Sequence, residues 1–255
     1  VGDTPFRLTP DATSLNEWAS NVRLAVEDND DGAVSFDEYM AMYYGAGFTS
    51  DNFGNNIVVP PSHMALRTII LNDQVAFPWF APAGTRRGGV SNATSSGYIN
   101  NEGEFVSVAL NTGQRDTLYS NKINPITFLS GAGLVVFGQK TRARNASALD
   151  RVNVARLTVY LRGQLELLAK PYLFEPNDKI TRDQIKAAAD ALLLELVALR
   201  ALYDYLVVCD ESNNTAARID RNELYLDVAI EPVKAIEFIY IPLRLKNTGE
   251  IAALG

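Results

Sequence analysis

The residues best suited to chemistry lie in an acidic loop near the start of the chain, at residues 27–38. Oxygen-bearing side chains stand there at the first, third, fifth, ninth and twelfth positions: Glu27, Asn29, Asp31, Ser35 and Glu38. This is the spacing with which an EF-hand loop surrounds calcium, with a glycine at the sharp turn and a carboxylate at the last position. The pattern makes these five residues candidate calcium ligands.

The same loop has a simpler interpretation as an acidic, solvated turn between two helices. Its first ligand position holds Glu instead of Asp, which crowds the site. EF-hands normally work in pairs, and the sequence contains no second loop of this kind. Short motifs also match by chance. Calcium binding at residues 27–38 is therefore a hypothesis beside the plain turn, and we expect no other cofactor.

Nucleophilic catalysis has little support in the sequence. The single histidine, His63, follows Ser62, but no orienting partner lies nearby in the sequence, as a Ser–His mechanism would require. Cys209 ends a strand-like apolar run, so we expect a small buried side chain. Glycines within residues 131–138 lack the strand–loop–helix context of a phosphate site and are typical of a turn. The sequence predicts no catalytic residue and no enzyme.

Composition limits the class of protein and its partners. The chain has 255 residues, of which 47% are hydrophobic and 21% are charged, which is typical of a globular protein. It carries 23 basic and 30 acidic residues, a net charge of −7. Nucleic acid and anionic membranes would repel such a chain. Because no apolar run reaches membrane-spanning length, we expect neither direct nucleic-acid binding nor membrane insertion.

Hydrophobic periodicity predicts several helices and strands. Apolar residues recur at helical spacing over residues 14–26, from about Asp150 to the residues before Lys170, and from Thr181 to about Tyr203. Ser14 and Thr181 are the predicted N-caps. Extended runs follow at residues 205–209, 223–230 and 235–245. We expect the α+β class, with helices packed on small mixed or antiparallel sheets.

Several segments resemble contractile bacteriophage tail sheath proteins, in the order found in that family. The sequence YSNKINPI at residues 119–126 is similar to a Y-S-N-x-I-N-P-I segment of the sheath. Further similar segments are PPS at 60–62, FAPAG at 80–84, VVFGQKT at 135–141, DRVNVARL at 150–157, YLFEPND at 172–178, YLVVCDESNNT at 205–215 and IDRNE at 219–223. The resemblance covers about residues 57–245, whereas residues 1–50 resemble nothing specific in the family.

The resemblance implies three parts. Residues 1–110 would be part of the sheath middle domain, which has a subtilisin-like fold, with a variable acidic insertion. Residues 111–245 would be the conserved C-terminal sheath domain, and residues 246–255 a C-terminal arm. Sheath proteins are usually longer than this chain, which starts at Val1. We therefore expect the C-terminal part of a larger subunit.

The resemblance also implies a function. The protein would be a structural subunit of a contractile tail sheath, which polymerises around the tail tube and contracts to drive the tube through the host envelope for genome ejection. Expected partners are other copies in a helical sheath, the tail tube protein, and the baseplate and tail terminator proteins. The expected location is the virion, with assembly in the host cytoplasm. The arm would add a strand to a neighbouring sheet, with residues 238–245 as a docking edge.

Two other functions remain open on the sequence. One is a calcium-binding structural or adaptor module that uses residues 27–38. The other is a hydrolase, suggested by the subtilisin-like middle domain of the family. A single histidine beside no suitable partner disfavours the hydrolase.

Overall fold

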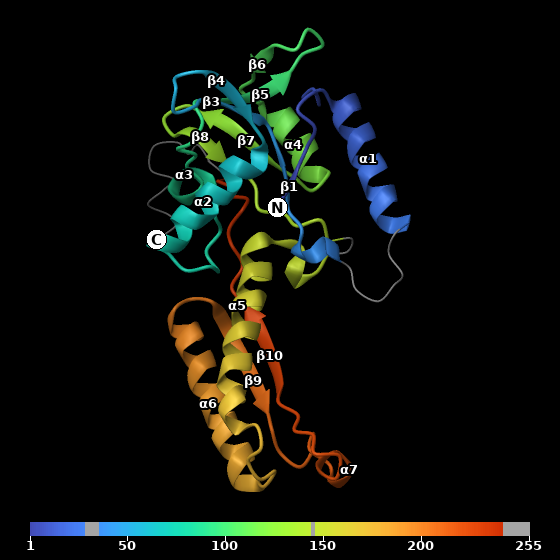
Figure 1. Cartoon of the computed structure of the whole chain (residues 1–255), viewed down its shortest axis with the longest axis vertical. Helices are drawn as coiled ribbons and strands as arrows, with labels where there is room; N and C mark the ends of the chain where they lie inside the picture. Colours follow the sequence, from blue (N-terminus) through green and yellow to red (C-terminus); the bar gives the residue numbers. More distant parts are fainter. Residues whose placement is uncertain (29–35, 144–145, 242–255) are drawn as a thin grey trace, which may run out of the picture.

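The computed structural model describes residues 1–28, 36–143 and 146–241. The chain forms two parts, one above the other in Figure 1. The upper part, here called the head, contains every element up to the 3-10 helix η2 (Ala148–Asp150) and ends at Arg151, directly before α5. The lower part, here called the stalk, contains two long helices, a two-stranded sheet and a short helix. The fold is therefore α+β with small sheets, as the sequence predicted.

Two four-stranded sheets form the centre of the head. The first has the order β1-β2-β7-β8, with parallel pairs β1–β2 and β2–β7 and an antiparallel pair β7–β8. The second has the order β4-β3-β5-β6 and is antiparallel throughout. The strands are β1 Gly2–Asp3, β2 Met42–Tyr44, β3 Ala46–Ser50, β4 Asn56–Val59, β5 Ser95–Ile99, β6 Phe105–Ser107, β7 Ile123–Leu129 and β8 Gly133–Val136.

Helices cover these sheets and extend from them. They are α1 Ala12–Asp28, η1 Phe36–Tyr39, α2 Pro61–Val75, α3 Gly84–Arg87, α4 Thr112–Ser120 and η2 Ala148–Asp150. Helix α1 begins two residues before the predicted start, because Asp11 accepts a hydrogen bond from the backbone of Ser14 at 2.9 Å. Asp11 therefore acts as the N-cap in place of Ser14. The second element that flanks the acidic loop, η1, is a four-residue 3-10 helix.

Buried polar side chains cross-link the strands of the head, and one of them, Ser96, joins its two sheets. Gly45 lies between β2 and β3 with φ of 106°, a conformation that side chains with a Cβ rarely adopt. Next to it, the Ser96 hydroxyl donates to the carbonyl of Ile126 at 2.9 Å and so links the sheets. Asn124, fully buried in β7, donates to the carbonyls of Met42 and Lys140 at 3.1 and 2.8 Å. Asn124 belongs to the segment at 119–126, so that segment is structural.

The stalk is a helix pair packed on a hairpin-like sheet. Its elements are α5 Val152–Ala169, η3 Lys170–Tyr172, α6 Lys179–Ala198, β9 Leu202–Val208, α7 Ala216–Ile219 and β10 Asp227–Pro232. Strands β9 and β10 are antiparallel, with Val228 opposite Val207. Helix α6 begins after Asp178, whose side chain accepts from the backbone of Thr181 at 2.9 Å. The predicted cap at Thr181 is therefore three residues too late.

A tryptophan from the head completes the core of the stalk. Trp79 packs with buried residues of α5, α6 and β9, and its indole donates to the carbonyl of Leu199 at 3.0 Å. Its ring lies edge-on to Tyr160, with the centroids 5.5 Å apart. Because an aromatic group with a satisfied N–H is a strong buried contact, this contact fixes the top of the stalk to the head.

Candidate assembly surface

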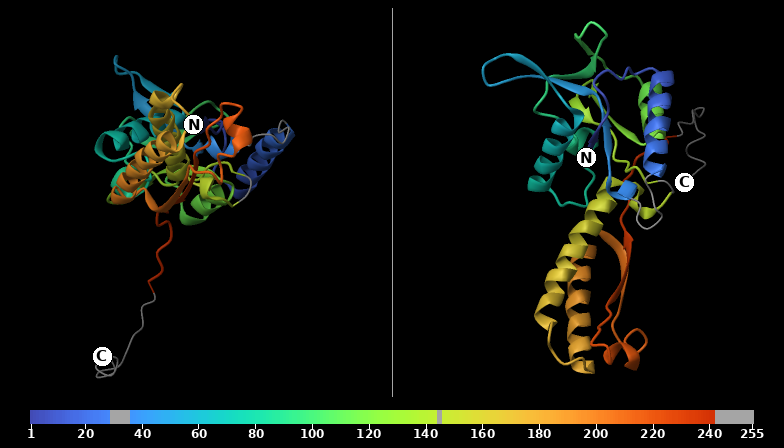
Figure 2. Two further views of the ribbon diagram at one scale, coloured as in Figure 1. Left: turned by 90° about the horizontal axis from the view of Figure 1, so that it is seen from below. Right: turned by 45° about the vertical axis from the view of Figure 1, so that its right-hand side comes forward.

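The most exposed apolar part of the described chain is its C-terminal segment, defined here as residues 233–241. After β10, the backbone of Val233 donates to the carbonyl of Ala201 at 2.9 Å, and the chain then runs in an extended path. The left view of Figure 2 shows it leaving the body in red. Its large apolar side chains are 66–87% exposed, namely Ile236, Phe238, Ile239, Tyr240 and Ile241. Such a cluster is typical of an interaction surface.

One residue of this segment faces inward. The Glu237 carboxylate receives hydrogen bonds from Arg151, at 2.6 and 2.9 Å, and from Gln139 at 3.2 Å, and it also bonds Tyr119. Burial alone would raise the pKa of Glu237, but the bonds from Arg151 and Tyr119 outweigh it and lower that pKa. No motif in the sequence marks Glu237 as a functional residue. The available signal was one acid within an otherwise apolar run, residues 235–241.

The sheet beside this segment is small and open. In the described part of the chain, β9 and β10 pair only with each other, so each has an edge without a partner strand. Val207, Val228 and Ile230 pack against the helices. On the opposite face, Leu206 is 60% exposed, and Asp204 lies across from Glu231. Because an unpaired edge offers free N–H and C=O groups, this sheet can accept a further strand.

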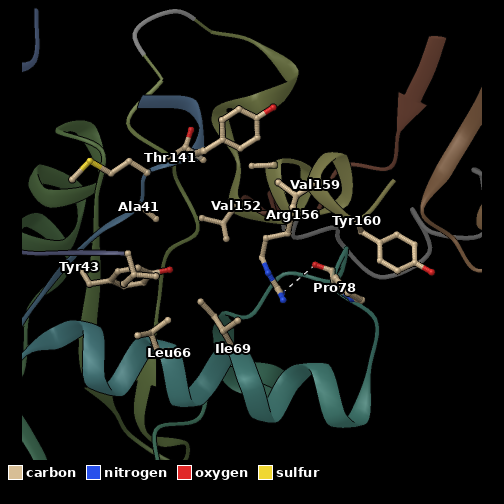
Figure 3. Close-up of a pocket in the computed structure, with 14 residues that line it drawn as sticks. Ala41, Tyr43, Leu66, Ile69, Pro78, Thr141, Val152, Arg156, Val159 and Tyr160 are labelled. Carbon is tan, nitrogen blue, oxygen red and sulfur yellow. Dashed lines mark hydrogen bonds between the residues drawn. The ribbon is translucent and has the colours of Figure 1, made fainter. Parts of the chain in front are cut away.

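A hollow of about 440 Å³ lies at the junction of head and stalk. Figure 3 shows Tyr43, Leu66, Ile69 and Val152 around it, with Arg156 bonded to the carbonyl of Pro78 at 3.2 Å. Burial raises the pKa of Tyr43 to about 12, although Arg156 acts against this. Arg156 is also paired with Asp73. The lining residues of this hollow include no carboxylate, histidine or cysteine, and its guanidinium is already paired, so we assign it no chemistry.

Most of the predicted calcium ligands cannot be placed. Asn29, Asp31 and Ser35 lie outside the described residues, and only the backbone of Glu27 is described, at the end of α1. Glu38 lies in η1. Within the described ranges, no cluster of three or more His, Cys, Asp or Glu side chains is arranged to hold a metal ion. Calcium binding at residues 27–38 stays a prediction, which calorimetric titration of the protein with calcium would test.

The other candidate residues have structural surroundings. The Ser62 hydroxyl donates to Asp3 at 2.8 Å, whereas His63 lies exposed on α2. Cys209 is buried, as expected, and burial raises the pKa of its thiol, which disfavours the reactive thiolate. No helix in the described ranges is long and apolar enough to cross a membrane.

Comparisons with known proteins identify the class to which this fold and surface belong. Residues 145–246 match the family model of the phage tail sheath C-terminal domain. The chain is 41% identical over 176 residues to the tail sheath protein of Vibrio phage KVP40, and 35% identical over 177 residues to that of Enterobacteria phage T4. Each match covers 69% of this chain and 25% of the relative. The chain is thus a homologue of these phage tail sheath proteins, and it spans about a quarter of their length.

Solved structures share the fold. The sheath of an extracellular contractile injection system, PVC, in its contracted state matches with a TM-score of 0.70 and 21% identity, over 89% of this chain and 60% of that one. The baseplate structure of the anti-feeding prophage matches with a TM-score of 0.68 and 23% identity, over 93% and 67%. These matches extend the likeness to most of the head. The division expected at residues 110 and 111 stays a prediction, although β2 and β7, from either side of it, pair directly.

Proposed function

We propose that the protein containing this chain is a structural subunit of a contractile tail sheath in the virion. It polymerises around the tail tube and contracts to drive the tube through the host envelope for genome ejection. The observation that carries the proposal is the C-terminal segment, an extended stretch with five exposed apolar side chains near the end of the part that matches the sheath C-terminal domain. A monomer that kept such a strand in water would expose an aggregation-prone surface without benefit.

Copies of the protein would join by strand addition, in which an extended segment of one copy pairs with the sheet of the next. The C-terminal segment offers backbone groups and large exposed apolar side chains, and the arm expected at residues 246–255 would follow it. The open edges of β9 and β10 offer the complementary groups on a neighbouring copy. Because donor and acceptor are different surfaces, the contact is heterologous and continues from copy to copy. Contacts of that kind generate helical assemblies.

The mechanical output requires no catalytic residue. Contraction follows when the packing of folded subunits in the contracted lattice is more stable than their packing in the extended lattice. A difference of a few kcal/mol for each subunit is sufficient when many subunits change together. The protein is therefore proposed to be no enzyme. Its further partners are the tube, baseplate and tail terminator proteins, and its assembly takes place in the host cytoplasm.

Electron microscopy of the purified full-length protein tests this function. We expect tubular particles with a helical repeat, either alone or on co-expression with the tube protein. Particles in two lengths and diameters would correspond to the two lattices. A full-length protein that stays monomeric in the presence of tube protein, under conditions where it is folded, would contradict the proposal.

A further inference from the structure

Beyond Val233, the described residues of the C-terminal segment are bound to the body at Glu237. Between residues 234 and 241 every residue except Glu237 is exposed. The Glu237 side chain is only 15% exposed. A hollow of about 350 Å³ remains between the segment and the head, with Ile236 and Phe238 at its border. The carboxylate of Glu237 therefore holds this segment to the body, and apolar packing does not.

The socket for this carboxylate is built from three parts of the head. Tyr119 comes from the end of α4, Gln139 from the chain after β8, and Arg151 from the residue that precedes α5. Arg151 binds both carboxylate oxygens through its Nε and a terminal nitrogen. A forked guanidinium–carboxylate contact fixes direction as well as distance. The socket thus sets both the position and the orientation of residue 237.

The charge balance of the socket depends on Glu237. Lys140 lies close by, with its ammonium 2.7 Å from the carbonyl of Tyr119 and 4.0 Å from the centre of the Tyr119 ring. Arg151 also pairs with Asp150 at 3.0 Å. If the carboxylate of Glu237 were absent, Asp150 alone would balance two partly buried cations. Loss of one partner from such a group costs more than the contact itself contributes.

The socket lies where the two parts of the molecule meet. Arg151 directly precedes α5, the helix that runs from the head down the stalk (Figure 1). The backbones of Lys140 and Arg151 form a β-bridge, and the backbone of Val152 donates to Gln139 at 2.7 Å. A force applied to residues beyond Glu237 therefore acts on the junction of head and stalk and not on the end of β10.

We propose that Glu237 is a positioning residue for the strand that joins copies: its carboxylate, bound to Tyr119, Gln139 and Arg151, fixes the point from which the strand leaves the body. This proposal rests on the proposed function. Residues up to Glu237 belong to the body, and the linking strand begins at Phe238. Tension between neighbouring copies enters each copy at the head–stalk junction, so the link holds while the lattice changes.

A matched pair of substitutions tests the anchor in the full-length, unassembled protein. Glu237→Gln removes the charge at nearly constant shape. Glu231→Gln makes the same change six residues earlier, at an exposed site, and is the control. Trypsin cleavage after Lys234 reports release of the segment, because cleavage requires local opening. We expect about tenfold faster cleavage in Glu237→Gln and no change in the control, at a temperature where both proteins are fully folded.

Assembled particles test what the anchor does. We expect Glu237→Gln sheaths to break between rings during contraction, and Arg151→Lys, which keeps the charge but loses the fork, to show an intermediate effect. Equal trypsin cleavage of Glu237→Gln and the wild-type protein would overturn the anchor. Faster cleavage with intact contracted sheaths would overturn its role in the link. If the wild-type protein forms no tubular particle, the proposed function fails, while the trypsin comparison still decides the anchor.

Discussion

At the scale of single residues, Glu237 predicts a specific dependence of stability on pH. Its pKa in the folded chain lies below the ordinary 4.5, because bonds from Arg151 and Tyr119 outweigh burial. A group with a lowered folded pKa stabilises the fold above its unfolded pKa, and this stabilisation is lost as the pH falls through the folded value. We therefore expect Glu237→Gln to be less stable than wild type at pH 7, with the difference vanishing in acid. Urea unfolding of both proteins between pH 7 and pH 3 measures it, and a constant difference would contradict the assignment.

Arg200 carries backbone strain that a substitution can remove. It has φ of 63° at the end of α6, where the backbone of Ala201 bonds the carbonyl of Leu196 at 2.8 Å. This is a Schellman ending, and glycine is the usual residue at that position. We expect Arg200→Gly to stabilise the chain by about 0.5–1 kcal/mol, the excess of the strain relieved over the backbone entropy of glycine. Arg200→Ala keeps a Cβ and should show no gain. Chemical denaturation of the two variants compares them, and equal stability would exclude strain as the cause.

At the scale of elements, two adjacent leucines of α6 distinguish the effect of burial on stability from the effect of helix propensity. Leu193 is fully buried in the stalk core, whereas Leu194 is 62% exposed. We expect Leu193→Ala to lower the free energy of unfolding by about 2–5 kcal/mol, because it leaves a cavity between α5, α6 and β9. Leu194→Ala changes the helix propensity by the same amount. Its free energy of unfolding should therefore lie within about 0.5 kcal/mol of the wild-type value. Thermal or urea unfolding measures both, and similar losses would mean that α6 does not pack as described.

The long helices of the stalk were predictable, while the head sheets were not. Apolar stripes at helical spacing locate α5 and α6, because such a stripe is formed by residues that are close together in the sequence. The caps of α1 and α6 were placed late, because Asp11 and Asp178 precede the first periodic residue of each helix. Strands β1 and β2 are two and three residues long, and their parallel pairing depends on segments distant in the sequence. No local pattern determines such a pairing.

The candidate surface was only partly predictable for the same reason. The run at residues 235–245 was recognised as extended and apolar, and through residue 241 the structure forms no strand with the rest of the chain. The role of Glu237 depends on Arg151, which is 86 residues away. A contact between residues so far apart in the sequence produces no periodic pattern from which it could be predicted.

At the scale of the whole molecule, the head and the stalk act as one body. Trp79 joins the stalk core, and the Glu237 socket includes Arg151, the residue directly before α5, at the same junction. A body fixed at two places transmits force with little internal bending. Under the proposed function, two lattices would then differ by movement of whole copies while the linking strands stay attached.

The last prediction concerns that link. Ile239 and Ile241 are 76% and 82% exposed, and both lie beyond the anchor. We expect the double variant Ile239→Asp with Ile241→Asp to fold as stably as wild type, since the side chains lose no burial, and yet to form no tubular particles. Two carboxylates would have to be buried unpaired against the neighbouring copy.

Ile236→Asp is the matched control. Ile236 is equally exposed, at 81%, but it precedes Glu237 and so belongs to the body. Electron microscopy and sedimentation of the three full-length proteins compare them, and we expect the control to assemble. Assembly of the double variant would show that residues beyond Glu237 do not join copies. Loss of assembly in the control as well would place the start of the linking strand before the anchor.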